Sequence, residues 1–174
     1  RDASGITVSP ASPSCSGVPV TLTAPFANSY SWSPGGATTQ SIVHNSGTAS
    51  YTVTLGYGNI GCSATASQTV TVLAPAVNAV ANQGFCNGAS ASVSFSGGDV
   101  GTTYNWTNSN TAIGLGASGS GNLSFTATNA GAAAISGTIT VTPVNGVCTG
   151  TPITFTITVN PTPTVNAVGN QVVC

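Results

Sequence analysis

The side chains best able to do chemistry in this chain are five cysteines: Cys15, Cys62, Cys86, Cys148 and Cys174. In a small secreted domain, regularly placed cysteines indicate a disulfide framework. No C-x-x-C pair is present and His44 is the one histidine, so the sequence predicts neither a zinc site nor any other cofactor. We therefore predict two disulfides among the first four cysteines, with Cys174 unpaired within this chain.

The titratable side chains do not suggest a catalytic site. Asp2 lies near the start of the chain, Asp99 lies in a glycine-rich turn, and His44 precedes the turn at 45–47. A nucleophile needs a base and an orienting acid, and calcium needs about six to eight oxygen ligands with several carboxylates. Because these three side chains meet neither requirement, we expect no enzymatic activity and no metal site.

Short strands must position these residues, because apolar and hydroxyl side chains alternate in many segments. This period of two is typical of half-buried strands, as in VTLTA at 20–24 and YTVTL at 51–55. No segment has the periodicity and caps of a helix, so we predict none. The predicted strands are 6–8, 18–24, 30–32, 38–43, 51–55, 68–73, 76–80, 91–95, 104–106, 123–128, 137–142 and 153–159.

An internal repeat organises the chain. NAVANQGFC at 78–86 returns as NAVGNQVVC at 166–174, an offset of 88 residues, and fixed-period similarity indicates a repeat architecture. We predict a first repeat at 1–74, a longer second repeat at 75–162, and the first strand of a truncated third repeat at 163–174, which implies a longer parent protein. The extra length of the second repeat falls in the Gly/Ser-rich segment 113–122, where we expect a loop.

The strand pattern predicts an all-β fold of tandem antiparallel, immunoglobulin-like β-sandwiches, because each repeat has about seven short strands with regularly spaced turns. Such sandwiches bury a tryptophan on the third strand, and each repeat has a Tyr-x-Trp there. We therefore predict that Trp32 and Trp106 are core aromatics. The alternative is that they form a platform on which sugar rings stack.

The pairing of the cysteines stays open. Our first prediction joins Cys15 to Cys62 and Cys86 to Cys148, each within one repeat. However, the first turn and the last hairpin of an immunoglobulin topology lie at opposite ends of the sandwich, and bonded cysteines need Cα atoms within about 7 Å. The alternative is therefore a Cys15–Cys148 bond between repeats.

The charge content restricts the partners. Only 2% of the residues are charged, with one Lys or Arg and two Asp or Glu, against about 25% in ordinary proteins. A basic stripe cannot form, so we expect no nucleic acid and no anionic membrane surface as partner. No apolar run reaches the roughly 18 residues of a membrane span. A neutral surface rich in hydroxyls instead suggests an extracellular protein held at the cell surface in an array.

The motifs resemble those of a known family. CSGVPVTLTA at 15–24 and YSWS at 30–33, with CNGAS at 86–90 and TYNWTN at 103–108, resemble the PKD-like and Ig-like repeats of Bacteroidota surface proteins. The resemblance implies cargo of the type 9 secretion system, such as the gliding-motility adhesins. The first repeat departs from ordinary PKD domains, because WSPGG at 32–36 replaces their Asp-rich turn, which argues further against calcium.

These observations predict a non-catalytic, structural or adhesive segment of a large extracellular surface protein. Its expected partners are neighbouring repeats, other copies in a filament or array, and surface glycans. Two alternatives remain: a subunit or segment of an extracellular filament, and a carbohydrate-binding module of a secreted enzyme.

Overall fold

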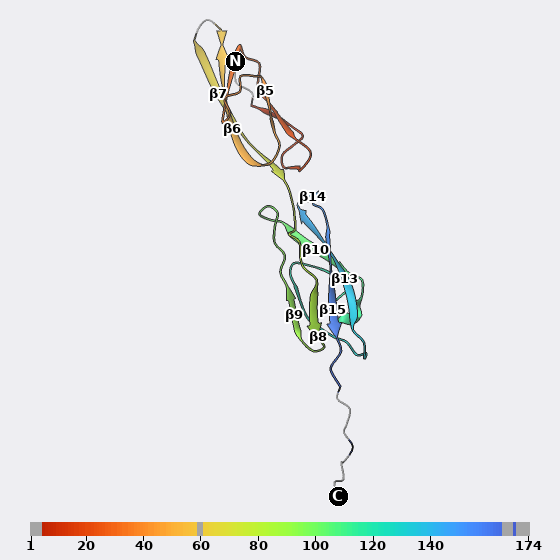
Figure 1. Cartoon of the computed structure of the whole chain (residues 1–174). Helices are drawn as coiled ribbons and strands as arrows, with labels where there is room; N and C mark the ends of the chain where they lie inside the picture. Colours follow the sequence, from red (N-terminus) through yellow and green to blue (C-terminus); the bar gives the residue numbers. More distant parts are fainter. Residues whose placement is uncertain (1–4, 59–60, 165–168, 170–174) are drawn as a thin grey trace. The chain divides into compact units, whose positions relative to one another are not determined.

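The computed structural model of the chain describes residues 5–58, 61–164 and 169 (Figure 1). Its contacts divide the chain into two compact units. Unit 1 comprises the chain up to Ala76 together with Gly97–Thr103 and Pro143–Thr151, and unit 2 comprises Val77–Ser96, Tyr104–Thr142 and the chain from Pro152. Unit 1 therefore contains two short segments of the second sequence repeat.

Unit 1 is a sandwich of two sheets. The three-stranded sheet has the order β1-β3-β5 and the four-stranded sheet has the order β2-β7-β6-β4. Neighbouring strands pair antiparallel, except that β2 pairs parallel with the end of β7. The strands are β1 (Thr7–Ser9), β2 (Ser14–Cys15), β3 (Val20–Thr23), β4 (Ser29–Ser33), β5 (Ser41–His44), β6 (Gly47–Tyr57) and β7 (Cys62–Leu73).

The core of unit 1 follows from the alternation in its strands. Alternate residues of β3, β6 and β7 are mostly apolar and are the more buried set, while Thr and Ser face outward. Burying one such apolar side chain contributes roughly 1.5–3 kcal/mol, so this alternation supplies most of the driving force for folding. The largest side chains that are at most 1% exposed are Val20, Leu22, Trp32, Val53, Leu55, Val70 and Val72.

Unit 2 has a larger sheet and a smaller one. The larger sheet has the order β11-β10-β13-β15-β8, and β12 pairs with β9 in the smaller. A short strand, β14 (Cys148–Thr149), pairs with the end of β13 and falls in unit 1 by its contacts. The other strands are β8 (Gln83–Cys86), β9 (Ser90–Val93), β10 (Thr103–Asn108), β11 (Ser118–Ser120), β12 (Leu123–Thr126), β13 (Ile135–Asn145) and β15 (Ile153–Asn160).

The predicted loop at 113–122 is wrong, because this segment contributes to the core and to a sheet. Ile113 is 0% exposed and Leu115 is 4% exposed. Gly119 of β11 lies opposite Trp106 of β10, and a Cβ there would meet the indole Cζ2 at 2.3 Å. The extra residues of the second repeat therefore cover the tryptophan and require a glycine against its ring.

The expected absence of helix also needs a correction. A 3-10 turn, η2 (Thr111–Ile113), follows Asn110, whose side chain accepts a hydrogen bond from Ala112 N at 3.1 Å. A turn of three residues is too short to leave a periodic pattern. In the described part of the chain, no helix has the length and apolar character needed to cross a membrane.

Several strand boundaries differ from the prediction. Segment 76–80 is not a strand, although Asn78 N donates to Ser96 O at 2.7 Å; pairing begins later, at Gln83. β6 and β7 begin four and six residues earlier than predicted. The added residues are mostly small and give only weak alternation. They are nevertheless paired across the β6–β7 hairpin, whose antiparallel register runs from Gly47–Val72 to Tyr57–Cys62.

We predict that Trp32→Ala strongly destabilises unit 1. Trp32 is 1% exposed and its indole Nε1 donates to Thr39 O at 2.9 Å, so truncation leaves a large cavity. The free energy of unfolding should fall by about 3–5 kcal/mol in urea titrations followed by circular dichroism. Phe26→Ala is the matched control, because Phe26 is 76% exposed. An equal effect of the two substitutions would contradict the assignment of Trp32 to the core.

Candidate functional site

Unit 1 contains a disulfide between Cys15 and Cys148. The Cα atoms are 5.4 Å apart and the sequence separation is 133 residues. The favoured prediction, Cys15–Cys62 with Cys86–Cys148, is therefore wrong, and the alternative pairing is the one that forms. Both cysteines lie on two-residue strands, Cys15 at the end of β2 and Cys148 at the start of β14.

The register of β2 explains why the predicted bond cannot form. Cys15 pairs with Leu73, the last residue of β7, whereas Cys62 is the first residue of the same strand. A strand rises about 3.3 Å per residue, so the two ends of β7 are roughly 35 Å apart. Bonded cysteines need Cα atoms within about 7 Å, so Cys15 lies at the wrong end of the strand to reach Cys62.

The remaining cysteines are not brought together with this bond. Cys62 is exposed at the start of β7, and Cys86 has a free, exposed thiol at the end of β8. Cys174 lies outside the described residues, so its predicted lack of a partner remains a prediction. The second predicted bond, Cys86–Cys148, is excluded because the sulfur of Cys148 is already bonded to Cys15.

The two tryptophans have different environments. Trp32 is buried in the core of unit 1, as core packing predicts. Trp106 is half-buried and packs against the core of unit 2, and its Nε1 has no hydrogen-bond partner among the described residues. Since one ring is enclosed and the other lies against Gly119, neither forms the flat exposed platform on which sugar rings stack.

His44 and Asp99, the candidate acid–base residues that the structure describes, form hydrogen bonds with the backbone. His44 is 7% exposed at the end of β5, with Nε2 at 2.9 Å from Gly47 O and Nδ1 at 3.1 Å from the Tyr51 hydroxyl. Because a carbonyl can only accept, Nε2 donates to Gly47 O, while Nδ1 and the Tyr51 hydroxyl form the second hydrogen bond. The carboxylate of Asp99 accepts from Ala74 N. Both therefore act as structural residues, whereas Asp2 lies outside the described residues.

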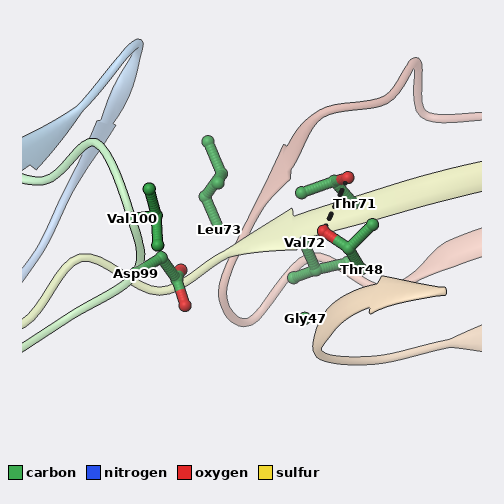
Figure 2. Close-up of a pocket in the computed structure, with 7 residues that line it drawn as sticks. All are labelled: Gly47, Thr48, Thr71, Val72, Leu73, Asp99 and Val100. Atoms are coloured by element: carbon green, nitrogen blue, oxygen red, sulfur yellow. Dashed lines mark hydrogen bonds between the residues drawn. The ribbon is translucent and has the colours of Figure 1, made fainter.

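A shallow pocket of about 250 Å³ lies beside Asp99 in unit 1. Figure 2 shows Asp99 and Val100 on one side and the hydrogen-bonded hydroxyls of Thr48 and Thr71 on the other, with Leu73 between them. The carboxylate is engaged by the backbone, and Val100 is fully exposed. No three His, Cys, Asp or Glu side chains converge as a metal site here or elsewhere among the described residues.

A more extensive feature is a row of hydroxyl pairs across β6 and β7. Thr48 bonds Thr71 at 3.0 Å, Ser50 bonds Thr69 at 2.6 Å, and Thr52 bonds Ser67 at 2.7 Å. Thr54 faces Thr65 in the same register, which continues the row. We call these eight residues the hydroxyl face of unit 1.

The hydroxyl face is continued on β4 and has a counterpart in unit 2. Ser31 and Ser33 of β4 lie opposite Thr54 and Thr52 and are exposed. In unit 2, Ser136 of β13 bonds Thr158 of β15 at 2.9 Å, and two further threonine pairs follow in register. The pairing was not predicted from the sequence, although alternating Thr in both strands of each hairpin was a signal for it.

Hydroxyl pairs of this kind can bind other hydroxyls. A hydroxyl both donates and accepts, so in each bonded pair one O–H and several lone pairs still point to solvent. Successive pairs lie about 6.8 Å apart along the strands, since every second residue faces the same side. The hydroxyl face therefore presents a periodic, uncharged set of donors and acceptors.

The comparisons with known proteins concern the fold. No family model matches the sequence, and no curated protein matches it. Similar solved structures include immunoglobulin domains 1–4 of Sidekick-1 (14% identity, TM-score 0.49, covering 94% of this chain and 50% of that one).

Two further similar structures are tandem modules. They are the fibronectin(III)-like modules of Clostridium thermocellum CbhA (12% identity, TM-score 0.39, covering 95% of this chain and 100% of that one) and the Ig1-2 module of the Drosophila receptor protein tyrosine phosphatase DLAR (13% identity, TM-score 0.38, covering 90% and 99%). This chain spans about half the length of the Sidekick-1 chain. At these identities and TM-scores, the likeness to tandem immunoglobulin-like and fibronectin-like modules assigns no function.

We predict that loss of the Cys15–Cys148 bond destabilises unit 1. In the chain-entropy model, a closed loop of this length contributes roughly 5 kcal/mol, and measured losses of native bonds are about 2–5 kcal/mol. Cys15→Ala with Cys148→Ala should lower the urea midpoint accordingly, without added reductant. Cys86→Ser is the control and should change the midpoint little, because its side chain is exposed. A double variant as stable as the unmodified chain would contradict the bond.

Proposed function

We propose that this chain is a load-bearing, adhesive repeat segment of a large extracellular bacterial surface protein, without catalytic function. The observation that carries the proposal is the Cys15–Cys148 bond. Disulfides persist in oxidising compartments, which supports an extracellular location. The resemblance to PKD-like repeats of Bacteroidota supports a surface adhesin exported by the type 9 secretion system.

The bond determines how tension passes through the chain. A pull on the two ends reaches Cys15 from one side and Cys148 from the other, and the shorter covalent route runs through the two sulfurs. The residues between them are then relieved of load, even if their strands separate. Fully extended, the 133 residues of this segment would add about 450 Å of length, which the bond withholds.

Strand pairing adds a second resistance to tension, which acts once the bond is reduced, because β7 and β8 lie inside the loop that the intact bond relieves of load. In unit 1 the early strand β2 pairs parallel with the end of the last strand, β7. In unit 2 the first strand, β8, pairs parallel with β15 over the four positions from Ile157–Gln83 to Asn160–Cys86. When parallel strands are pulled from opposite ends of a domain, their hydrogen bonds are loaded together in shear rather than opened one at a time. This arrangement raises the force needed to start unfolding.

We predict that oxidation state controls the extensibility of the chain. In single-molecule force measurements with terminal handles, the oxidised chain should not release the length enclosed by the bond. After reduction with dithiothreitol, stepwise unfolding should add about 450 Å. Cys15→Ala with Cys148→Ala should behave like the reduced chain without reductant, and Cys86→Ser should behave like the unmodified chain. Full extension of the oxidised chain would overturn the load-bearing role of the bond.

The hydroxyl face supports the adhesive part of the proposal, with a neutral polysaccharide as the ligand. A sugar surface is uncharged and rich in hydroxyls, so it matches the donors and acceptors of this face without any charge to desolvate. Each hydrogen bond contributes only about 0.5–1.5 kcal/mol net, so binding must come from many pairs acting together. A regular row over two long strands provides this multiplicity.

We predict that replacing one hydroxyl pair weakens adhesion. Ser50→Lys with Thr69→Glu exchanges the pair for an ion pair, which preserves cross-strand attraction but interrupts the row. Sedimentation with insoluble cellulose or chitin should show binding weakened by about tenfold. The matched control is Thr23→Lys with Ser41→Glu, which makes the same exchange in the pair bonded at 2.9 Å on the other sheet. If both double variants bind like the unmodified chain, or the unmodified chain does not bind, the hydroxyl face is not adhesive.

A further inference from the structure

Cys86 has a free thiol at a defined position in unit 2. It is the last residue of β8, pairs in register with Asn160 at the end of β15, and is exposed. The next residue, Asn87, donates its N–H to Asn160 O at 2.9 Å. The Asn87 side chain also bonds Asn129 N and the Thr162 hydroxyl, so the backbone after the thiol is fixed.

Cys15 occupies the same position in unit 1. It is the last residue of β2 and pairs in register with Leu73 at the end of β7, and Ser16 N donates to Leu73 O at 2.7 Å. The following turns also match. Val18 N bonds Cys15 O at 3.0 Å and Ala89 N bonds Cys86 O at 3.1 Å, with Gly17 at φ 87° and Gly88 at φ 83°.

In unit 1, the cysteine at this position forms a disulfide. The sulfur of Cys15 is bonded to Cys148, which comes from the repeat that follows in the sequence. Cys148 is the first residue after the turn between β13 and β14 and lies opposite Asn145, with Gly146 at φ 59° in the turn. The position therefore receives a cysteine presented by the hairpin of a following repeat.

We propose that Cys86 is the covalent attachment site for the hairpin cysteine of a following repeat built like the second. Two thiols lose two protons and two electrons to a disulfide oxidant, such as an oxidised dithiol oxidoreductase, and one S–S bond forms. The proposal rests on the proposed function only in taking the chain as part of an array. Since Cys86 lies between Cys15 and Cys148 in the sequence, successive loops would overlap and each repeat would be bonded to the next.

A longer chain that keeps the 88-residue repeat register tests the proposal. In the repeat alignment, Cys174 occupies the position of Cys86. We therefore extend the full chain after Cys174 with a second copy of residues 87–162, which completes a third repeat. This copy adds one hairpin cysteine, 88 residues after Cys148. The extended chain is oxidised, its thiols are blocked at low pH, and its peptides are mapped without reduction. The expected map links Cys86 to the added cysteine and retains Cys15–Cys148. A link from the added cysteine to Cys174, or a blocked Cys86 thiol, would overturn the proposal.

Two controls keep the result interpretable. Cys86→Ser in the extended chain should abolish the new link and leave Cys15–Cys148 in place. In the 174-residue chain itself, oxidised glutathione should add one glutathione at Cys86, located by peptide mapping; a Cys86 that resists modification also overturns the proposal, whether or not the extended chain folds. The force measurement depends only on Cys15–Cys148, so failure of this inference and failure of the proposed function are separable.

Discussion

The bond between Cys15 and Cys148 holds together two strands that backbone pairing alone would hold poorly. β2 and β14 have two residues each, whereas strands in globular proteins usually have three to ten. Each short strand is paired on one side, β2 with β7 and β14 with β13. The disulfide fixes both at once, and with them the segments of the second sequence repeat that belong to unit 1. The position of Asp99 against Ala74 adds a hydrogen bond to the same region.

Hydroxyl pairs take the place of charged pairs in fixing strand register and keeping the surface of this chain polar. The chain has no lysine and no glutamate, so the hairpins that the structure describes have no cross-strand ion pairs to fix their register. The pairs from Thr48–Thr71 to Thr52–Ser67 fix it instead, because a slip by one residue would bury every hydroxyl and expose every apolar side chain. Threonine also favours extended backbone through its β-branch. One residue type therefore supplies strand propensity, register and solubility.

Much of the fold was readable from the sequence, because alternation is a local signal. It predicted the segments that became β3, β6, β7, β13 and β15, and the Tyr-x-Trp on the third strand of the expected sandwich predicted the burial of Trp32. Alternation could not predict which cysteines form the disulfide, since this depends on the end of β7 with which β2 pairs. That register is set by a parallel pairing of two residues, Ser14–Val72 and Cys15–Leu73, which leaves no periodic trace. The role of segment 113–122 was missed for a related reason: only two of its residues, Ile113 and Leu115, are buried apolar ones, and they lie among glycines and serines with no strand alternation.

The bond also explains how repeats of unequal length can share one architecture. The second repeat is longer than the first, and its extra residues at 113–122 lie between Cys15 and Cys148. In the load-bearing role that we propose, the shortest covalent route runs through the sulfurs, so residues added inside the loop would change neither the path of the load nor its length under tension. Such residues are free to cover Trp106 or to enlarge a sheet. Insertions outside the loop would lengthen the loaded chain directly, so mechanical function would tolerate variation inside the bond better than outside it.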